Sequence, residues 1–257
     1  MPVITNCNPA TKSESRASNG KPLSIAVKKQ EIGKSRTLLR RYKQQLTSLS
    51  KVEGQVAIGI MLGDASLQTQ DGGKSYRLKL LQGDKNKDYL FHLCTVFSRW
   101  ILSPPSPQNR QSKITGKDLK AWRSQTISHK AFNILAKIFL DERGKKRILP
   151  NLVKEHLTDR SLAYWLMDDG GKSNYNKDRP KLKGVTINTQ GFSKAEVDSM
   201  VAQLISVLGL DCWMGRNKGK WTIVISGKSF PMLAKRIGPY IHPSMVYKFP
   251  KGLQEFL

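Results

Sequence analysis

The sequence predicts an α+β fold built from two pseudo-symmetric repeats, each with the element order αββαββα. One observation is that ISHKAF at 127–132 returns as ISGKSF at 225–230. Another is that AIGIMLGDAS at 57–66 and LAYWLMDDGG at 162–171 are both short apolar segments that end on aspartate and a small residue. Basic and apolar residues alternate with a period of two between these landmarks, which predicts β-hairpins. A chain that repeats itself in register is expected to fold as two similar units.

The repeats set the predicted domain boundaries. Residues 44–150 are expected to form the first repeat and residues 151–257 the second. Residues 1–43 are rich in basic side chains with scattered Ser, Thr, Asn and Gly, which predicts a partly flexible basic arm. An organelle transit peptide has a similar composition, so this alternative stays open for the arm.

The charge of the chain indicates its partner. Its 257 residues include 44 Lys and Arg against 19 Asp and Glu, a formal net charge of +25. Such an excess repels itself unless a polyanion is the usual partner, so nucleic acid is predicted; the alternative is a protein that is merely basic. The three cysteines lie too far apart in sequence to indicate a zinc site or a disulfide framework. The chain lacks an apolar run near the ~18 residues of a membrane span.

A second helix is predicted in each repeat after the first hairpin. Ser193 and Glu196 have the spacing of a capping box, and apolar residues then recur at helical spacing up to Leu208. The same rhythm runs from Leu90 to Ile101 in the first repeat. Both apolar stripes are interpreted as core without chemistry.

The strands are predicted at 75–81 and 181–189, with less regular partners at 119–126 and 219–226. Alternation places Arg77 and Lys79 on one face of the first strand and its leucines on the other. One face of the sheet is therefore expected to be charged and the other buried.

The two helices that end at the aspartate motifs are apolar on more than one side, so they are expected to pack on each other about a pseudo-two-fold axis. Gly59 and Gly63 would allow close approach of the two backbones. The second helix has Tyr164 and Asp168 at the corresponding positions, so the packing is expected to be asymmetric.

Helices packed in this way, in the same direction, would bring Asp64 and Asp169 together at two negative helix ends. Such a site repels itself unless a cation lies in it, and an oxygen-only ligand set favours Mg²⁺ over zinc. The backbone carbonyls of Gly63 and Asp168 are unpaired at the helix ends and are predicted as further ligands. The alternative for either motif alone is an ordinary helix-ending turn.

A metal site facing a basic surface predicts phosphodiester hydrolysis. Arg147 in RILP and Lys248 in YKFP lie near the ends of the two repeats and are predicted to stabilise transition-state charge or to position water. Arg147 is alternatively one solvated base among several, because Lys145 and Lys146 adjoin it. The four histidines are interpreted as structural.

These residues resemble a known family. AIGIMLGDA and LAYWLMDDG look like the two motifs of single-chain LAGLIDADG homing endonucleases, in the subgroup typified by the omega-intron enzyme of mitochondrial large ribosomal RNA genes. The likeness runs from about Arg36 to Pro250. It includes ILSPP, SQT, AFNILA, YNK, NTQ and MVYKFP.

The resemblance implies a monomeric saddle of two antiparallel sheets over double-stranded DNA, with the motif helices at the centre. It implies magnesium-dependent cleavage of both strands across the minor groove, leaving 3′ overhangs, with Mn²⁺ as a substitute. Asp64 and Asp169 would be metal-binding catalytic acids and Lys248 a basic active-site residue. Arg147 stands where a Lys is expected, which keeps the charge and changes the geometry. Met167 stands where the family motif has an aspartate.

Strands of such a saddle would read bases in the major groove. The candidate DNA-binding residues are Arg77, Lys79, Lys120, Arg123, Lys172, Asn174, Tyr175, Lys181, Lys183, Arg216, Lys218 and Lys220. The alternatives to a nuclease are an RNA maturase that binds intron RNA and a non-catalytic nucleic-acid-binding protein. The family's usual setting is an organelle, mitochondrion or chloroplast.

Overall fold

The computed structural model describes residues 26–111, 116, 118–173 and 184–257. The chain divides into two compact units, Met1–Gln45 and Leu46–Leu257. In the first unit a short 3₁₀ turn, Lys29–Glu31, precedes helix α1 at Arg36–Gln45. The predicted basic arm, 1–43, is therefore helical over its last residues, and residues 1–25 lie outside the described part.

The second unit has the predicted order αββαββα twice, so this prediction is confirmed. The first repeat consists of α2 (Lys51–Leu62), β1 (Ser66–Gln68), β2 (Arg77–Gly83), α3 (Lys87–Val96), β3 (Ser106–Gln111), β4 (Asp118–Gln125) and α4 (Asn133–Phe139). After α5 (Leu152–His156), the second repeat consists of α6 (Asp159–Asp169), β5 (Gly170–Lys172), β6 (Val185–Ile187), α7 (Lys194–Leu208), β7 (Cys212–Asn217), β8 (Lys220–Ile225) and α8 (Phe230–Ile237). Helix α9 (Lys251–Gln254) follows, and 3₁₀ turns include η2 (Asp84–Asn86) and η7 (Pro243–Lys248).

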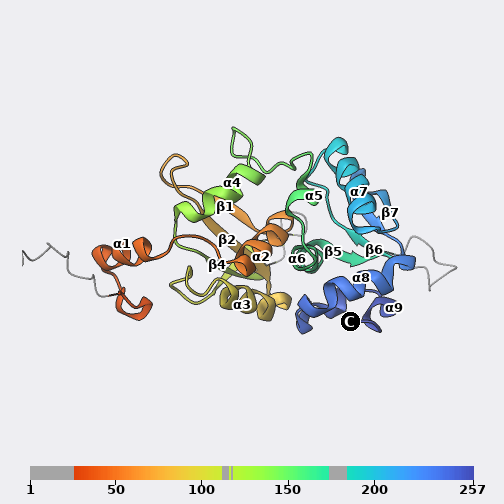
Figure 1. Cartoon of the computed structure of the whole chain (residues 1–257). Helices are drawn as coiled ribbons and strands as arrows, with labels where there is room; N and C mark the ends of the chain where they lie inside the picture. The colour runs from red at the N-terminus through yellow and green to blue at the C-terminus, as the bar shows by residue number, and fades with distance from the viewer. Residues whose placement is uncertain (1–25, 112–115, 117, 174–183) are drawn as a thin grey trace, which may run out of the picture. The chain divides into compact units, whose positions relative to one another are not determined.

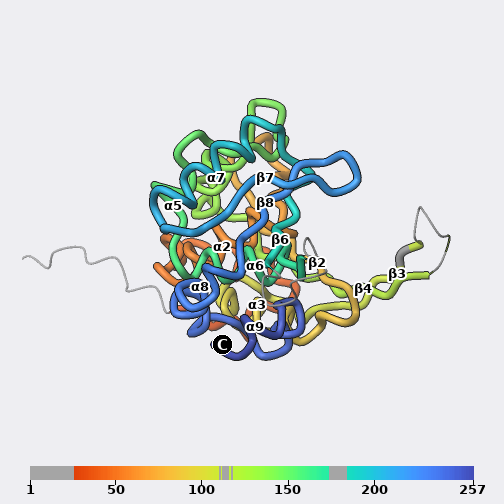
Figure 2. Tube along the Cα trace, turned by 90° about the vertical axis from the view of Figure 1, so that its right-hand side faces the viewer, coloured from red at the N-terminus to blue at the C-terminus, as the bar shows by residue number. Residues whose placement is uncertain are grey.

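Each repeat contains one antiparallel four-stranded sheet, with strand orders β1-β2-β4-β3 and β5-β6-β8-β7. Figure 1 shows α2 and α6 side by side at the centre of this unit, with one sheet on either side. Figure 2 shows the β3–β4 and β7–β8 hairpins projecting from the same side. The two sheets therefore present a pair of arms on one side of the helix pair.

The alternation predicted for β2 is confirmed, because Leu78 and Leu80 are buried while Lys79 is exposed. The capping box predicted for α7 is also present. Ser193 Oγ accepts from the N–H of Glu196, and the Glu196 carboxylate accepts from the N–H of Ser193. Gly209, with φ of 67°, then ends α7 in the left-handed conformation that favours glycine.

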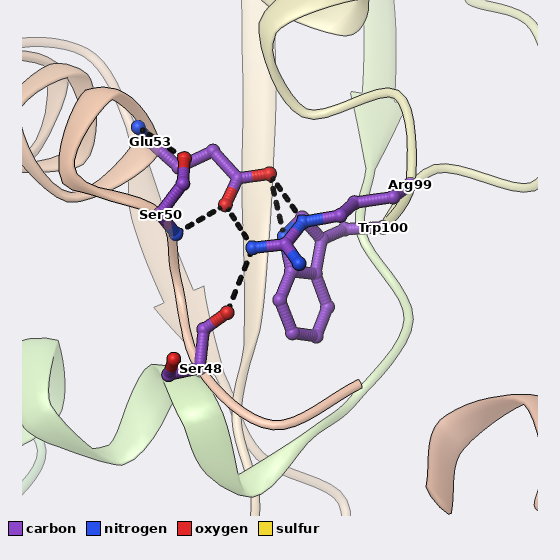
Figure 3. A network of polar contacts seen from close by, with 5 residues as sticks. All are labelled: Ser48, Ser50, Glu53, Arg99 and Trp100. Atoms are coloured by element: carbon purple, nitrogen blue, oxygen red, sulfur yellow. Dashed lines mark hydrogen bonds and ion pairs between the residues drawn. The ribbon is translucent and has the colours of Figure 1, made fainter. Parts of the chain in front are cut away.

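The predicted second helix of the first repeat ends earlier than expected, at Val96 rather than near Ile101. Figure 3 shows the reason, since Arg99 and Trp100 turn toward Glu53 at the start of α2. Arg99 donates from Nε and Nη2 to the two carboxylate oxygens, at 2.8 and 2.6 Å, and Trp100 Nε1 donates at 2.9 Å. Glu53 also completes a capping box with Ser50, so this network fixes the beginning of the helix that ends beside Asp64.

The close approach predicted for α2 and α6 is confirmed. A Cβ added to Gly59 would lie 2.4 Å from the carbonyl oxygen of Ser161 and 2.7 Å from Cβ of Tyr164. A Cβ added to Gly63 would lie 2.4 Å from Cβ of Asp168. The later residue of α2, Gly63, contacts the later residue of α6, Asp168. The two helices therefore run in the same direction and their C-terminal ends meet.

We predict that Gly59→Ala lowers the free energy of unfolding by about 1–3 kcal/mol, because the new methyl group overpacks the helix contact. Gly54→Ala is the matched control on the same helix, since its Cβ would meet nothing within 4 Å. Alanine should there stabilise the helix by up to about 1 kcal/mol. Urea unfolding of both variants measures the difference, and equal effects would contradict the helix contact described above.

Candidate active site

The two helix ends are joined directly by the aspartates of the motifs. The backbone N–H of Asp64 donates to Oδ2 of Asp168 at 3.2 Å. Asp168 is buried, whereas the side chain of Asp64 reaches the surface and Asp169 is partly buried. The backbone carbonyl of Asp169 accepts from the backbone N–H and the side-chain amide of Asn188, both at 3.0 Å. The structure thus places three carboxylates at the meeting point of two negative helix ends.

Gln82 on β2 belongs to this site and is not among the residues predicted from the sequence. Its Nε2 donates to Oδ2 of Asp64 at 3.3 Å and to Oδ1 of Asp168 at 3.2 Å. Its Oε1 accepts from Asn86 Nδ2 at 3.1 Å, and Asn86 Oδ1 accepts from the hydroxyl of Tyr247 at 2.8 Å. The only available signal was that Gln82 falls on the buried face of an alternating strand, where a polar side chain needs partners.

Two lysines contact the carbonyl groups at the ends of the helices. Lys146 Nζ donates to the carbonyls of Gly63 at 2.8 Å and Ala65 at 3.0 Å. Lys248 Nζ donates to the carbonyl of Met167 at 2.6 Å and to that of Asp168. Each ammonium group therefore neutralises the negative end of the motif helix in its own repeat.

The structure brings Lys146, and not Arg147, to the helix ends. The chain folds back after α4 at a turn closed by the bond from the N–H of Gly144 to the carbonyl of Asp141. Lys146 then forms an antiparallel bridge with Leu140, and the adjacent Arg147 side chain is exposed. Alternation along this extended segment orients the neighbours oppositely. Lys146 is therefore placed at the helix ends, whereas the basic role predicted for Arg147 stays a prediction.

The pKa values of the three aspartates are raised because their carboxyl groups lie close together where few water molecules can reach them. Burial and the neighbouring Asp64 raise the pKa of Asp169 to about 7. Burial and Asp64 also raise the pKa of Asp168 well above its ordinary value, and burial raises the pKa of Asp64 against the opposing charges of the two lysines. Burial lowers the pKa of both lysines, although the aspartates oppose this. A bound cation would therefore stabilise the ionised form of these carboxylates.

The donor set fits a hard divalent cation that is only partly held by protein. The available ligands are carboxylate oxygens of Asp64 and Asp169 and backbone carbonyl oxygens, the types that Mg²⁺ and Mn²⁺ accept. Within residues 26–111, 116, 118–173 and 184–257, no group of three or more His, Cys, Asp or Glu side chains forms a metal site by itself. Water or phosphate oxygens would therefore have to complete the coordination.

The strand register separates the candidate DNA-binding residues. Arg77, Lys79 and Arg123 lie on the face of the first sheet opposite its buried leucines. In the second sheet Lys220 lies on the face opposite Ile223 and Ile225, and Lys218, with φ of 50°, lies in the β7–β8 turn.

Other candidates are placed differently. Lys120 lies on the opposite face of β4 from Arg123, and its Nζ lies 3.6 Å from Oδ1 of Asp84. Arg216 pairs with Trp221 and stacks on its ring at 4.1 Å, and Lys172 pairs with Val185. Asn174, Tyr175, Lys181 and Lys183 lie outside the described residues, and contact with DNA stays a prediction for all twelve.

Two αββαββα repeats with aspartates at paired helix ends define the two-motif, single-chain class of LAGLIDADG proteins. The sequence matches the LAGLIDADG DNA endonuclease family over residues 54–233, a segment that includes Asp64 and Asp169. This chain belongs to that family. No helix in the described part of the chain is long and apolar enough to cross a membrane.

Similar proteins carry related names. The chain is 40% identical over 218 residues to the probable intron-encoded endonuclease 1 of Wickerhamomyces canadensis, covering 84% of this chain and 92% of that protein. It is 31% identical over 204 residues to the cytochrome b mRNA maturase bI2 of Debaryomyces hansenii, covering 78% and 74%. Its fold is similar to that of the homing endonuclease I-WcaI bound to its DNA recognition sequence, with a TM-score of 0.79 and 37% identity over 86% and 97% of the two chains.

We predict that the metal-free protein loses stability as pH rises from about 4 to about 7. Over this range folded Asp169 keeps a proton that the unfolded chain has released, because its pKa is raised from 3.8 to about 7. Asp169→Asn should make this slope shallower, with the raised pKa values of Asp168 and Asp64 supplying the remainder, and should raise the free energy of unfolding at pH 8 by about 1–2 kcal/mol. Urea unfolding at pH 5 and pH 8 measures both effects. The exposed Asp118→Asn is the control, and an unchanged slope in Asp169→Asn would contradict the crowded-acid site.

Proposed function

We propose that this chain is a site-specific, divalent-metal-dependent homing endonuclease that cuts both strands of double-stranded DNA. One observation carries the proposal: two parallel helix ends bring Asp64 close to Asp168 and Asp169, with an ammonium group of each repeat bound to the adjoining carbonyls. This arrangement places carboxylates that can bind a cation and ammonium groups that can bind a phosphate within one small site. Family membership and the likeness to a DNA-bound homing endonuclease support it.

The carboxylates of Asp64 and Asp169 would hold Mg²⁺, with Mn²⁺ as a substitute, and the carbonyls of Gly63 and Asp168 would serve as further ligands. A bound divalent cation would supply a lowered pKa for a coordinated water and charge neutralisation at phosphate. Lys146 and Lys248 would release the helix carbonyls to stabilise charge on the phosphate and the leaving oxygen. Gln82 would fix the orientation of the Asp64 carboxylate by donating to it.

The sheets would supply DNA binding. Basic residues stand on the sheet faces opposite the buried leucines and isoleucines. The β3–β4 and β7–β8 hairpins project from one side of the helix pair (Figure 2). Phosphate contacts of this kind should make binding fall with salt by about 0.9 log unit per phosphate neutralised. A saddle of two unlike sheets has no requirement for a palindromic target, so one chain would suffice as a monomer.

A second candidate function is assistance of intron splicing through binding of intron RNA. The observation that favours it is the 31% identity to a protein named as a cytochrome b mRNA maturase. The retained acids favour cutting and are compatible with both activities in one protein. An organelle is the setting that we propose in either case.

We predict that a duplex spanning the intronless host-gene junction is cut only when Mg²⁺ is present, with 3′ overhangs. Asp64→Asn and Asp169→Asn should each lower the rate by at least about 10²-fold, because each removes a charge that holds the cation. Gel analysis of end-labelled duplex, with and without EDTA, measures this. Specific binding without any metal-dependent cutting would overturn the nuclease proposal. Splicing of the host intron by the same preparation would then favour the maturase.

We predict that Lys146→Met slows cleavage by about 10²-fold, because it removes an ammonium group aimed at the site. Arg147→Met is the matched control, since that side chain is exposed and should change the rate no more than about threefold. The rates are compared under single-turnover conditions on the same duplex. A larger loss in Arg147→Met than in Lys146→Met would restore the assignment made from the sequence.

A further inference from the structure

A chain of side-chain hydrogen bonds connects the acid site to the last 3₁₀ turn of the molecule. It runs from Tyr247 on η7 through Asn86 on η2 to Gln82 on β2, with distances of 2.8 and 3.1 Å. From Gln82 it divides to Asp64 and Asp168 at 3.3 and 3.2 Å. We call these three residues, Tyr247, Asn86 and Gln82, the relay.

The hydrogen bonds of the relay are consistent with Gln82 donating to the acids. The carbonyl oxygen of Asn86 accepts from the hydroxyl of Tyr247. The NH₂ group of Asn86 is then left to donate to Oε1 of Gln82, which directs the NH₂ group of Gln82 at the two carboxylates. The opposite orientation of Gln82 would place its oxygen against carboxylate oxygens. The acceptor oxygens of Asp64 and Asp168 thus favour the orientation in which Gln82 donates to them, and Asn86, anchored by Tyr247, supplies the matching donor for Oε1 of Gln82.

The relay also joins the two repeats. Asn86 and Gln82 belong to the first repeat, whereas Tyr247 and Asp168 belong to the second. Tyr247 directly precedes Lys248, which contacts the end of α6. The amino group of Lys85 lies 3.6 Å from the centre of the Tyr247 ring, a cation–π contact that also joins η2 to η7. The turn that presents Lys248 is therefore tied to the strand that presents Gln82.

The two halves of the site are unequal in this respect. The Asp64 carboxylate accepts a hydrogen bond from the relay. Asn188, which contacts Asp169, donates to its backbone carbonyl instead of its carboxylate. Among the described residues, the carboxylate of Asp169 thus has no counterpart of the Gln82 contact.

We propose that Asn86 and Tyr247 are positioning residues for cleavage, which hold Gln82 in its donating orientation toward Asp64 and thereby favour one strand of the duplex. This inference rests on the proposed nuclease function. Loss of the relay should slow the two strands unequally, so that nicked product accumulates. Neither residue is assigned contact with the reacting atoms.

The test uses full-length protein, saturating enzyme and an intronless host-gene duplex labelled separately on each strand. Tyr247→Phe and Asn86→Ala each remove one bond of the relay and should slow one strand by about 2–10-fold, with the other strand less affected. Tyr240→Phe is the control for loss of a phenol hydroxyl in the same repeat. DNA affinity measured in EDTA should stay within about twofold, which separates positioning from binding and folding.

Asn86→Asp distinguishes a hydrogen-bonding role of the Asn86 amide from a role in packing. Aspartate matches the shape of Asn86 and accepts from Tyr247, but it has no NH₂ group for Gln82 and would draw the Gln82 amide away from the acids. A positioning role therefore predicts that Asn86→Asp is slower than Asn86→Ala, whereas a packing role predicts the reverse. Asn151→Asp, at an exposed site, controls for the added charge.

The outcomes separate the two proposals. Unequal strand rates, with Asn86→Asp the slowest variant, support the relay. Wild-type cutting with variants equal to their controls, or with both strands slowed alike, overturns the relay and leaves the nuclease intact. Failure of the wild-type protein to cut the duplex overturns the nuclease function and the relay's role with it.

Discussion

The close contact between α2 and α6 is the constraint on which the rest of the site depends. Gly59 and Gly63 leave no room for a side chain, so the helices approach backbone to backbone and end together. Parallel helices that end together combine two negative ends, and this chain adds Asp64 and Asp169 there. Packing of the buried apolar surface around the pair opposes that repulsion, because hydrophobic burial is the dominant favourable term in folding. The fold therefore holds acids where electrostatics alone would separate them, which is the condition a cation site requires.

One lysine from each repeat partly neutralises the negative charge at the paired helix ends. Lys146 and Lys248 bind the carbonyls that would otherwise be unpaired at the helix ends, and each comes from the tail of its own repeat. The repeats are thus similar in how they neutralise their helices. They differ in how their acids are held, because Gly63 on one helix meets Asp168 on the other. The buried carboxylate of Asp168 fills the space that Gly63 provides, and Gln82 can then reach both acids.

The sequence contained most of the architecture and part of the site. Hydrophobic periodicity, the capping box at Ser193 and the repeated motifs were sufficient for the element order, because these signals are local or repeat in register. The positions of Gln82 and Tyr247 were not accessible in that way, since they are 165 residues apart in number and are linked through Asn86 on η2. The contact of Lys146 with the end of α2 could not be predicted, because spacing from a proline does not fix which neighbour in an extended segment faces inward. Local patterns predict elements, whereas contacts between distant elements decide which side chains share a site.

In a single chain with two repeats, the two halves of the site can differ, whereas in a symmetric dimer they are identical. In a two-fold dimer every contact occurs twice, so both half-sites must be identical. Here the repeats share a fold while Gly59 faces Tyr164 and Gly63 faces Asp168, so the two sides of the central contact are chemically different. Gln82 contacts Asp64 and Asp168, and Asn188 contacts only the backbone of Asp169. The outer faces of the two sheets differ as well, with Arg77 and Lys79 on one and Lys220 on the other. Such a molecule is suited to a target whose halves differ in sequence, because each sheet and each acid can be adjusted without changing its counterpart.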